Sequence, residues 1–398
     1  MFQISQNKPV AWTRHELHEH LKTAILLELY TIPLYLYAAY SIVPGPDSPI
    51  STIIKIVKEE MLHLALAGNL LCATGGTPQL YGKDSTPSYP AQIFNDATPV
   101  NLSGATEATI KLFVKIEEPT HISDGATPGS GKTLLSDYDT IGHFYDGIIE
   151  GFVFKSRYPF LTNHCKIGLT ELSANPNDPL FDNTSENRQL YYSDESTLWL
   201  KKDLMAILKL EDAIYAMKLI VQQGEGVRPG ETGVDNPEND KRSHYEIFKS
   251  LLDHKLPSTH NVLDNPVTEN HKDDDAIYSV MRATDAVYCY LLLSIERLWS
   301  YAGPSRQDII DSNIMSLMQS VLPPLAKFLV KQPTKADPGR NAGPAFNFYE
   351  FDPTDSYKNA LGQLKGEIGN ALGKLPEEVR TDIQEAVDSL VDLGNLSV

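Results

Sequence analysis

Apolar residues recur at helical spacing from the start of the chain. Thr13 and Glu16 form a Ser/Thr-x-x-Glu pattern, the capping box that marks a helix N-terminus. The apolar run after it continues to Tyr40 and predicts one long helix. Pro33 lies within this run, so a kink or a local break is expected there.

A second helix should follow the turn at 44–47 and end at Gly75-Gly76. Further apolar runs predict additional helices, at about 105–118, 137–160, 196–223, 243–252, 276–301, 307–330, 357–372 and 377–393. No segment alternates in the manner of a strand pair, and 255–275 has the composition of a linker. The chain is therefore predicted to be mainly α, in two parts, 1–255 and 256–398.

The composition is that of an acidic globular protein. Of 398 residues, 41% are hydrophobic and 22% charged, and the 34 basic and 52 acidic side chains leave a net charge of −18. Such a balance argues against a nucleic-acid partner, which needs a basic face, and against docking on anionic lipid. Cys72, Cys165 and Cys289 are too few and too widely spaced to form a disulfide framework or a CxxC metal site.

The start of the chain, MFQISQNKPVAWTR, lacks the apolar core of a signal peptide. The longest strongly apolar stretch, 286–295, is about half the length that spans a bilayer. We therefore expect a cytoplasmic protein with no membrane partner. The oligomeric state is left open, with a homodimer as one option.

The most informative chemical signal is acidic and imidazole side chains in phase with apolar stripes. Glu28 continues the stripe that Leu21 and Ala24 begin, and Glu60 and His63 continue a stripe on the second helix. A buried carboxylate is costly without a partner, and a divalent metal would supply one. Carboxylate and imidazole ligands suit iron or manganese. The alternative is that these are partly exposed polar residues beside core leucines.

The later helices offer several further ligands, and spacing alone does not choose among them. Four candidates lie on the third and fourth helices and two lie beyond, namely His143, Asp146, Glu150, Glu211, Glu225 and His244. Glu117 is another acidic candidate, but a helix end before Pro119 explains it equally well. Tyr35, two turns from Glu28, could line a substrate pocket, although packing is the simpler interpretation.

Several blocks of sequence resemble the ferritin-like domain of iminophenyl-pyruvate dimer synthases, enzymes of bis-indole pigment pathways. The blocks are ELYTIPLYLYAAYSI, KEEMLHLALAGNLLCATGGTP, TIGHFYDGI, IVQQGEG and Ser243-His244-Tyr245. The resemblance implies a ferritin-like four-helix bundle over 1–255, followed by an additional helical C-terminal part. It assigns metal ligation to five residues, Glu28, Glu60, His63, Glu225 and His244. His143 stands where the family has Glu, so either His143 or Glu150 would complete the set, and Glu211 is the alternative to Glu225.

The function predicted on this basis is that of a non-haem dinuclear metal oxidase or oxygenase. Its cofactors would be two iron ions, with manganese as the alternative, and its partners O₂ and a small organic substrate, such as an amino-acid-derived imine. Metal storage and a purely structural role are the competing hypotheses. Residues 126–133 match a relaxed Walker A loop ending in Lys132-Thr133, but no strand precedes them, which disfavours phosphate binding.

Overall fold

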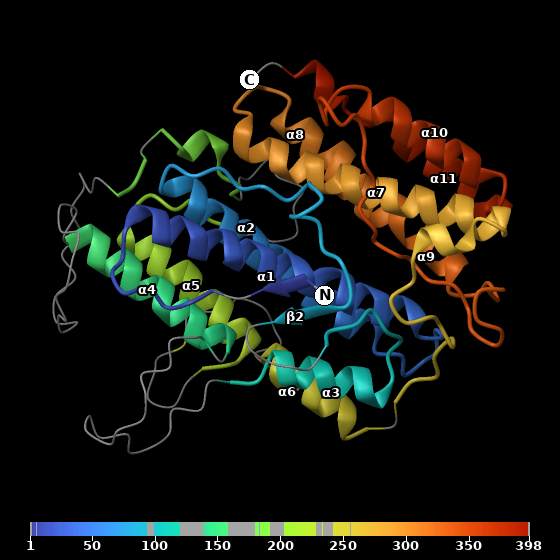
Figure 1. The fold of residues 1–398 in the computed structure, drawn as a ribbon, viewed down its shortest axis with the longest axis horizontal. Helices are drawn as coiled ribbons and strands as arrows, with labels where there is room; N and C mark the ends of the chain where they lie inside the picture. Colours follow the sequence, from blue (N-terminus) through green and yellow to red (C-terminus); the bar gives the residue numbers. More distant parts are fainter. Residues whose placement is uncertain are drawn as a thin grey trace.

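Four long helices form an antiparallel bundle in the computed structural model of this protein (Figure 1). Its pairs are α1 (Arg14–Ser41) with α2 (Ile50–Ala73), and α4 (Ile141–Arg157) with α5 (Leu210–Gly224). The structure describes residues 2–4, 6–93, 99–119, 138, 140–157, 180–182, 184–191, 203–227, 233, 242–254 and 256–396. Cys165 and the Walker-like segment 126–133 lie outside these residues.

Helix α1 is the central rod of the bundle and begins as the sequence predicts. The Thr13 hydroxyl accepts a hydrogen bond from the Glu16 backbone N–H at 3.0 Å. The helix then runs through Pro33 without a break, because the residues on both sides of Pro33 in the sequence are buried against neighbouring segments that hold the helix in place. Its composition and length would suit a membrane span, but 94% of the apolar window is buried inside the protein. It is therefore best explained as a core helix.

The fourth helix of the bundle begins later in the chain than the sequence predicts. Of the predicted stretch 196–223, the described residues 203–209 lie outside the helix, which starts at Leu210. The Gln189 side chain bonds both the N–H and the carbonyl of Ile207, at 2.6 and 3.0 Å. Asn69 donates to the Met205 carbonyl at 3.0 Å. Side chains from elsewhere thus satisfy this backbone, and an apolar run alone did not reveal it.

One end of the bundle is closed by two short helices that pack on each other. These are α3 (Glu107–Ile116) and α6 (His244–Leu252), shown together at the bottom of Figure 1. Two strands, β1 (Phe2–Ile4) and β2 (Ala91–Ile93), pair in parallel nearby. The expectation of no strand pair was wrong, because three residues are too few to display an alternating pattern.

The C-terminal part is also helical, as predicted, and lies against the bundle (Figure 1). Its elements are α7 (Asp275–Ser300), α8 (Arg306–Asp308), the π-helical η4 (Ile309–Met315) and η5 (Leu317–Val321), α9 (Leu322–Leu329), α10 (Ala360–Leu372) and α11 (Glu377–Asp388). Helix α7 contacts α2, and α9 contacts α1. The Trp299 indole N–H donates to Asn69 of α2 at 3.1 Å. The division at residue 255 stays a prediction, and buried contacts cross it.

Candidate metal centre

A first cluster of buried acidic and imidazole groups joins α1 to α2. Glu28, Glu60 and His63 are 3%, 2% and 2% exposed. His63 Nδ1 lies 3.5 Å from Glu28 Oε2 and 3.6 Å from Glu60 Oε2. The helical phase that the sequence predicts therefore does bring these three side chains to one point in the core.

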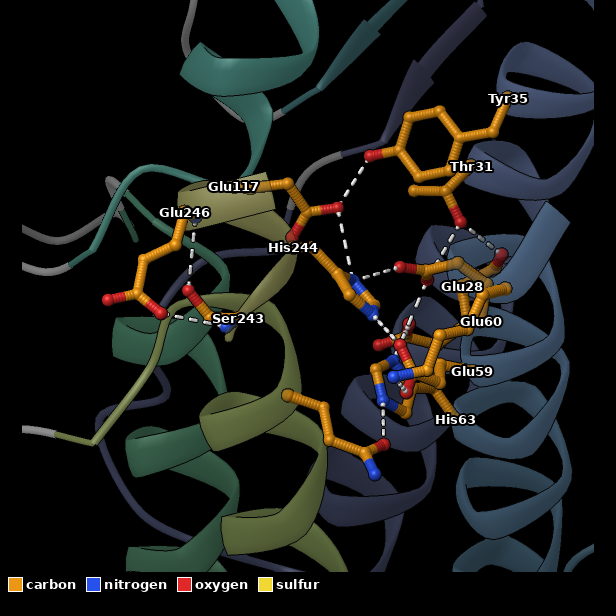
Figure 2. Close-up of polar contacts among 12 residues, drawn as sticks. Glu28, Thr31, Tyr35, Glu59, Glu60, His63, Glu117, Ser243, His244 and Glu246 are labelled. Atoms are coloured by element: carbon orange, nitrogen blue, oxygen red, sulfur yellow. Dashed lines mark hydrogen bonds and ion pairs between the residues drawn. The ribbon is translucent and has the colours of Figure 1, made fainter. Parts of the chain in front are cut away.

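A second cluster shares Glu60 with the first (Figure 2). His244 Nδ1 lies 2.8 Å from Glu60 Oε1 and 3.6 Å from Glu117 Oε1. His244 and Glu117 are buried, as Glu60 is. In each cluster the three ligand atoms lie within 4.8 Å of one another. Glu60 thus has one oxygen toward each imidazole, the arrangement of a carboxylate that bridges two cations.

Local sequence signals fix the two short helices that deliver the second cluster. His244 is the first residue of α6, where Ser243 and Glu246 form a reciprocal capping box. Glu117 is the C-cap of α3. A Cβ added at Gly224 would lie 3.1 Å from Glu117 Oε2, so a glycine there leaves room for this carboxylate.

A hydroxyl group donates to each of the three carboxylates. Tyr145 donates to Glu28 Oε1 at 2.6 Å, and Tyr35 donates to Glu117 Oε1 at 2.5 Å. Thr31 donates to Glu60 Oε2 at 2.9 Å, and Figure 2 shows the contacts of Tyr35 and Thr31. The predicted role of Tyr35 as a pocket residue stays a prediction, but its hydroxyl is already bound to the centre. These hydrogen bonds fix the orientation of the carboxylates beside the two imidazoles.

The outer nitrogen of each imidazole also has a partner. His63 Nε2 lies 2.9 Å from Gln223 Oε1, and His244 Nε2 lies 3.0 Å from Glu59 Oε2. An acceptor at Nε2 favours the tautomer that carries its proton there and leaves the Nδ1 lone pair pointing inward. Both imidazoles are thus positioned as Nδ1 ligands.

The electrostatics of this pocket strongly perturb its titrating groups. Burial raises the pKa of Glu28 to about 7, against the hydrogen bond from His63. Burial disfavours the His63 imidazolium, but Glu28 and Glu60 outweigh it and raise its pKa to about 10. Burial also disfavours the His244 imidazolium, but Glu117 and Glu59 outweigh burial and raise the pKa of His244 well above its ordinary value. Burial would raise the pKa of Glu60, but the imidazoles of His244 and His63 outweigh burial and lower this pKa.

The donor set fits a pair of divalent cations. Within the described residues, His244 Nδ1 is buried without a properly aligned hydrogen bond, although Glu60 Oε1 lies 2.8 Å away. A buried ring nitrogen without an aligned hydrogen bond is costly in a protein core, and a cation bound to its lone pair would remove that cost. The ligands are oxygen and imidazole nitrogen, a set that suits iron and manganese.

The structure brings four of the seven predicted site residues together, namely Glu28, Glu60, His63 and His244. Three predicted ligands belong to neither cluster. Glu150 is 56% exposed and pairs with Lys8 at 3.0 Å, and half-buried His143 packs its ring on Tyr138 at 5.5 Å. Glu225 is buried after the end of α5 and accepts from the Gly142 N–H at 2.6 Å.

Three other acidic residues, Glu211, Glu117 and Glu59, differ in how they relate to the two clusters. Glu211 lies in the first turn of α5 and belongs to neither cluster. Glu117 takes part in the second cluster, although the sequence explained it equally well as a helix end. Glu59, beside the predicted Glu60, was missed. Its signal was its place in Glu59-Glu60-x-x-His63, where a second acidic residue sits 100° round the helix and can face a different partner.

Comparison with known proteins identifies a family and distant relatives. The family model described as Ferritin-like matches residues 21–253. Dichlorochromopyrrolate synthase of Lentzea aerocolonigenes is 22% identical over 440 aligned positions, which cover 93% of this chain and 39% of that protein. The 2-imino-3-(indol-3-yl)propanoate dimerase of Chromobacterium violaceum is 24% identical over 373 positions, covering 83% of this chain and 34% of that protein.

A solved structure supports the fold independently. It is the crystal structure of a ferritin-like protein from Caulobacter vibrioides, with a TM-score of 0.51 and 20% identity. The match covers 77% of this chain and 95% of that one. At such identity the likeness concerns the fold. The curated relatives are named as enzymes, and this chain spans less than two fifths of their length.

Proposed function

The chain belongs to the ferritin-like family, and on that premise we propose that it is an O₂-dependent oxidoreductase that holds two metal ions, iron in preference to manganese, and oxidises a small organic substrate. One observation carries the proposal. Glu60 places its two oxygens toward two different imidazoles, and each imidazole has a further carboxylate beside it. A single cation would leave one of these groups without a partner.

The excess of negative charge in the centre supports bound cations. Four carboxylates, those of Glu28, Glu59, Glu60 and Glu117, surround His63 and His244, and Lys55 lies 3.6 Å from Glu59 as one counter-charge. With neutral imidazoles a negative charge remains, which divalent cations would offset. A buried site close to neutrality avoids much of the cost of desolvating charge.

Each residue of the centre has a defined part in this proposal. Glu28 and His63 would hold one ion, Glu117 and His244 the other, and Glu60 would bridge them. Bound iron would supply the exchange of electrons with O₂ that protein side chains do not provide. The side chains Thr31, Tyr35 and Tyr145 fix the carboxylates, and the apolar residues around them keep out bulk water.

For the substrate class we propose an amino-acid-derived imine. The support is the name of one relative, a dimerase of 2-imino-3-(indol-3-yl)propanoate. Joining two such imines forms one carbon–carbon bond and breaks one bond to hydrogen in each molecule. The two electrons and two protons released pass to O₂ and give hydrogen peroxide, so the reaction balances without a further reductant.

Metal analysis of purified protein reconstituted with Fe(II) tests the centre. Glu60→Ala and His63→Ala should each lower the metal content of a protein that keeps its helical circular dichroism. Glu150→Ala is the matched control, because Glu150 is exposed and pairs only with a surface lysine in the described structure. Full metal occupancy in either core variant would refute the assigned site.

Oxygen uptake tests the enzymatic part of the proposal separately. The Fe(II)-loaded protein, mixed with an α-imino acid generated in situ, should consume O₂ and yield a coupled product by mass spectrometry. A protein that binds iron at the assigned residues but consumes no O₂ with or without substrate would be a metal-binding protein without turnover. That result would overturn the oxidoreductase while leaving the site in place.

A further inference from the structure

A large apolar cleft separates the α1–α2 pair from the C-terminal helices. Its volume is about 530 Å³, within the range of roughly 300–1,000 Å³ usual for small-molecule sites. Ile32 and Leu36 of α1, Val57 of α2 and Leu322 of α9 are among the aliphatic residues that line it. In Figure 1, α7 and α9 lie beside α1 and α2 on the side away from α4 and α5.

A smaller cavity of about 70 Å³, the inner cavity, adjoins the cleft on the side of α1 and α2. The two spaces share five lining residues, Ile32, Met61, Tyr288, Leu291 and Met318. Apart from Tyr288, every described residue that lines the inner cavity is apolar. Such an apolar lining suits the hydrophobic body of a ligand.

Three exposed lysines, Lys58, Lys327 and Lys331, mark the mouth of the cleft, and no Asp or Glu occurs among its described lining residues. This concentration stands out in a chain whose net charge is −18. Burial, together with nearby Lys331, lowers the pKa of His260, which also lines the cleft, so its neutral form is favoured. Lys327 and Lys331 also line a neighbouring pocket that contains Glu378, Asp382 and Glu385. Lys327 and Lys331 are exposed and have no carboxylate within ion-pair distance among the residues that the structure describes. An anionic group at the mouth would complement them.

The wall opposite the bundle has an unusual backbone. Ile314 belongs to the π-helical segment η4, and Met318 and Gln319 belong to η5. π-Helical turns are rare and are frequently found at functional sites. Met61 and Met318 both line the inner cavity with flexible, polarizable side chains that adapt to ligand shape.

The cleft is distinct from the candidate metal centre. Its walls include Leu29 and Met61, which directly follow Glu28 and Glu60 in the sequence and so point about 100° away from them on their helices. Helices α1 and α2 therefore present metal-ligand candidates on one face and the cavity lining on another. A ligand in the cleft does not require that the metal centre be correctly assigned.

We propose that this cleft binds an amphipathic carboxylate, with its acid group at the lysine-lined mouth and its apolar body against the aliphatic walls. The lysines select the acid over a neutral or cationic analogue. The aliphatic walls select a long apolar body over a short one.

Isothermal titration with two matched probes tests the proposal. The probes are dodecanoate and dodecylammonium, which have the same apolar chain and opposite head-group charge. We expect dodecylammonium to bind at least about tenfold more weakly than dodecanoate. Equal affinities for the two probes would overturn the proposal.

Charge reversal at the mouth supplies the second arm. Lys327→Glu combined with Lys331→Glu should weaken binding of dodecanoate by about tenfold or more. Lys335→Glu combined with Lys358→Glu, two exposed lysines outside the cleft, is the matched control. Equal affinities in both double variants would overturn the proposal. So would a self-association, detected by sedimentation, that the cleft variant abolishes in the absence of acid binding, since the occupant would then be a second copy.

Discussion

Asp285 offers a sharp test of the electrostatics of the C-terminal part. Its carboxylate is 4% exposed, accepts from the Thr268 hydroxyl at 2.5 Å, and accepts from the Asn347 N–H at 2.9 Å. Burial raises its pKa from 3.8 to about 7 in the folded protein, against the pull of these hydrogen bonds. The folded state therefore favours the protonated acid, whereas the unfolded chain ionises near pH 4.

The sign and size of the effect follow from this shift. A raised folded pKa means that the full contribution is present below the unfolded pKa and is lost as pH rises through the folded pKa. A difference of about 3 pKa units corresponds to about 4 kcal/mol, of which about 3 kcal/mol should be lost between pH 5 and pH 8. Asp285→Asn keeps a carbonyl acceptor for Asn347 and removes the ionisation.

Urea-induced unfolding at a series of pH values measures this directly. The free energy of unfolding of Asp285→Asn, relative to the unmodified protein, should rise by about 3 kcal/mol between pH 5 and pH 8. Asp273→Asn, which alters an exposed carboxylate on the same stretch of chain, should leave the pH profile unchanged. A constant difference between the Asp285→Asn variant and the unmodified protein over this range would refute the reasoning.

Three further predictions concern particular contacts. Glu117→Gln should lower the iron content by about half because it weakens only the second cluster, whereas exposed Glu118→Gln should not, as metal analysis would show. Ser243→Ala should lower the free energy of unfolding by about 1 kcal/mol because it removes the N-cap of α6, and unchanged thermal stability would contradict this. Gly68→Ala should destabilise by about 1–3 kcal/mol in denaturant titrations because its Cβ would meet the Trp299 ring at 2.1 Å, while Gly366→Ala, which has open space around it, should be neutral or stabilising.

The long helices and their inward residues were predictable because helical phase is a local property. Glu28, Glu60 and His63 each continue an apolar stripe, and burial of the stripe carries them inward. The same logic explains the failure at Glu150. On α4 the buried stripe is Phe144, Ile148 and Phe152, so a polar row that starts at His143 lies toward the solvent side of the helix. Equal spacing of polar residues indicates a face but does not say which way it points.

Glu117 and Glu59 could not be ranked from the sequence for a different reason. Glu117 ends a helix of ten residues, too short for a stripe to fix its direction, and its inward position depends on how α3 packs against α6. Glu59 lies outside the inward phase and reaches His244 only because α6 returns to the bundle from far along the chain. Such contacts between distant segments are set by tertiary packing, which periodicity does not record.

The two halves of the centre therefore differ in how firmly the fold holds them. Glu28, Glu60 and His63 sit near the middle of helices of 28 and 24 residues, and these two helices pack along their length. Glu117 and His244 sit at the C-cap of a ten-residue helix and the first position of a nine-residue helix. Helix ends fray more readily than helix centres, so the second half depends on the Ser243–Glu246 capping box and on α3–α6 packing. Since Glu60 belongs to both halves, a cation at the rigid half would fix the carboxylate that the other half needs, and the two ions should then bind in order.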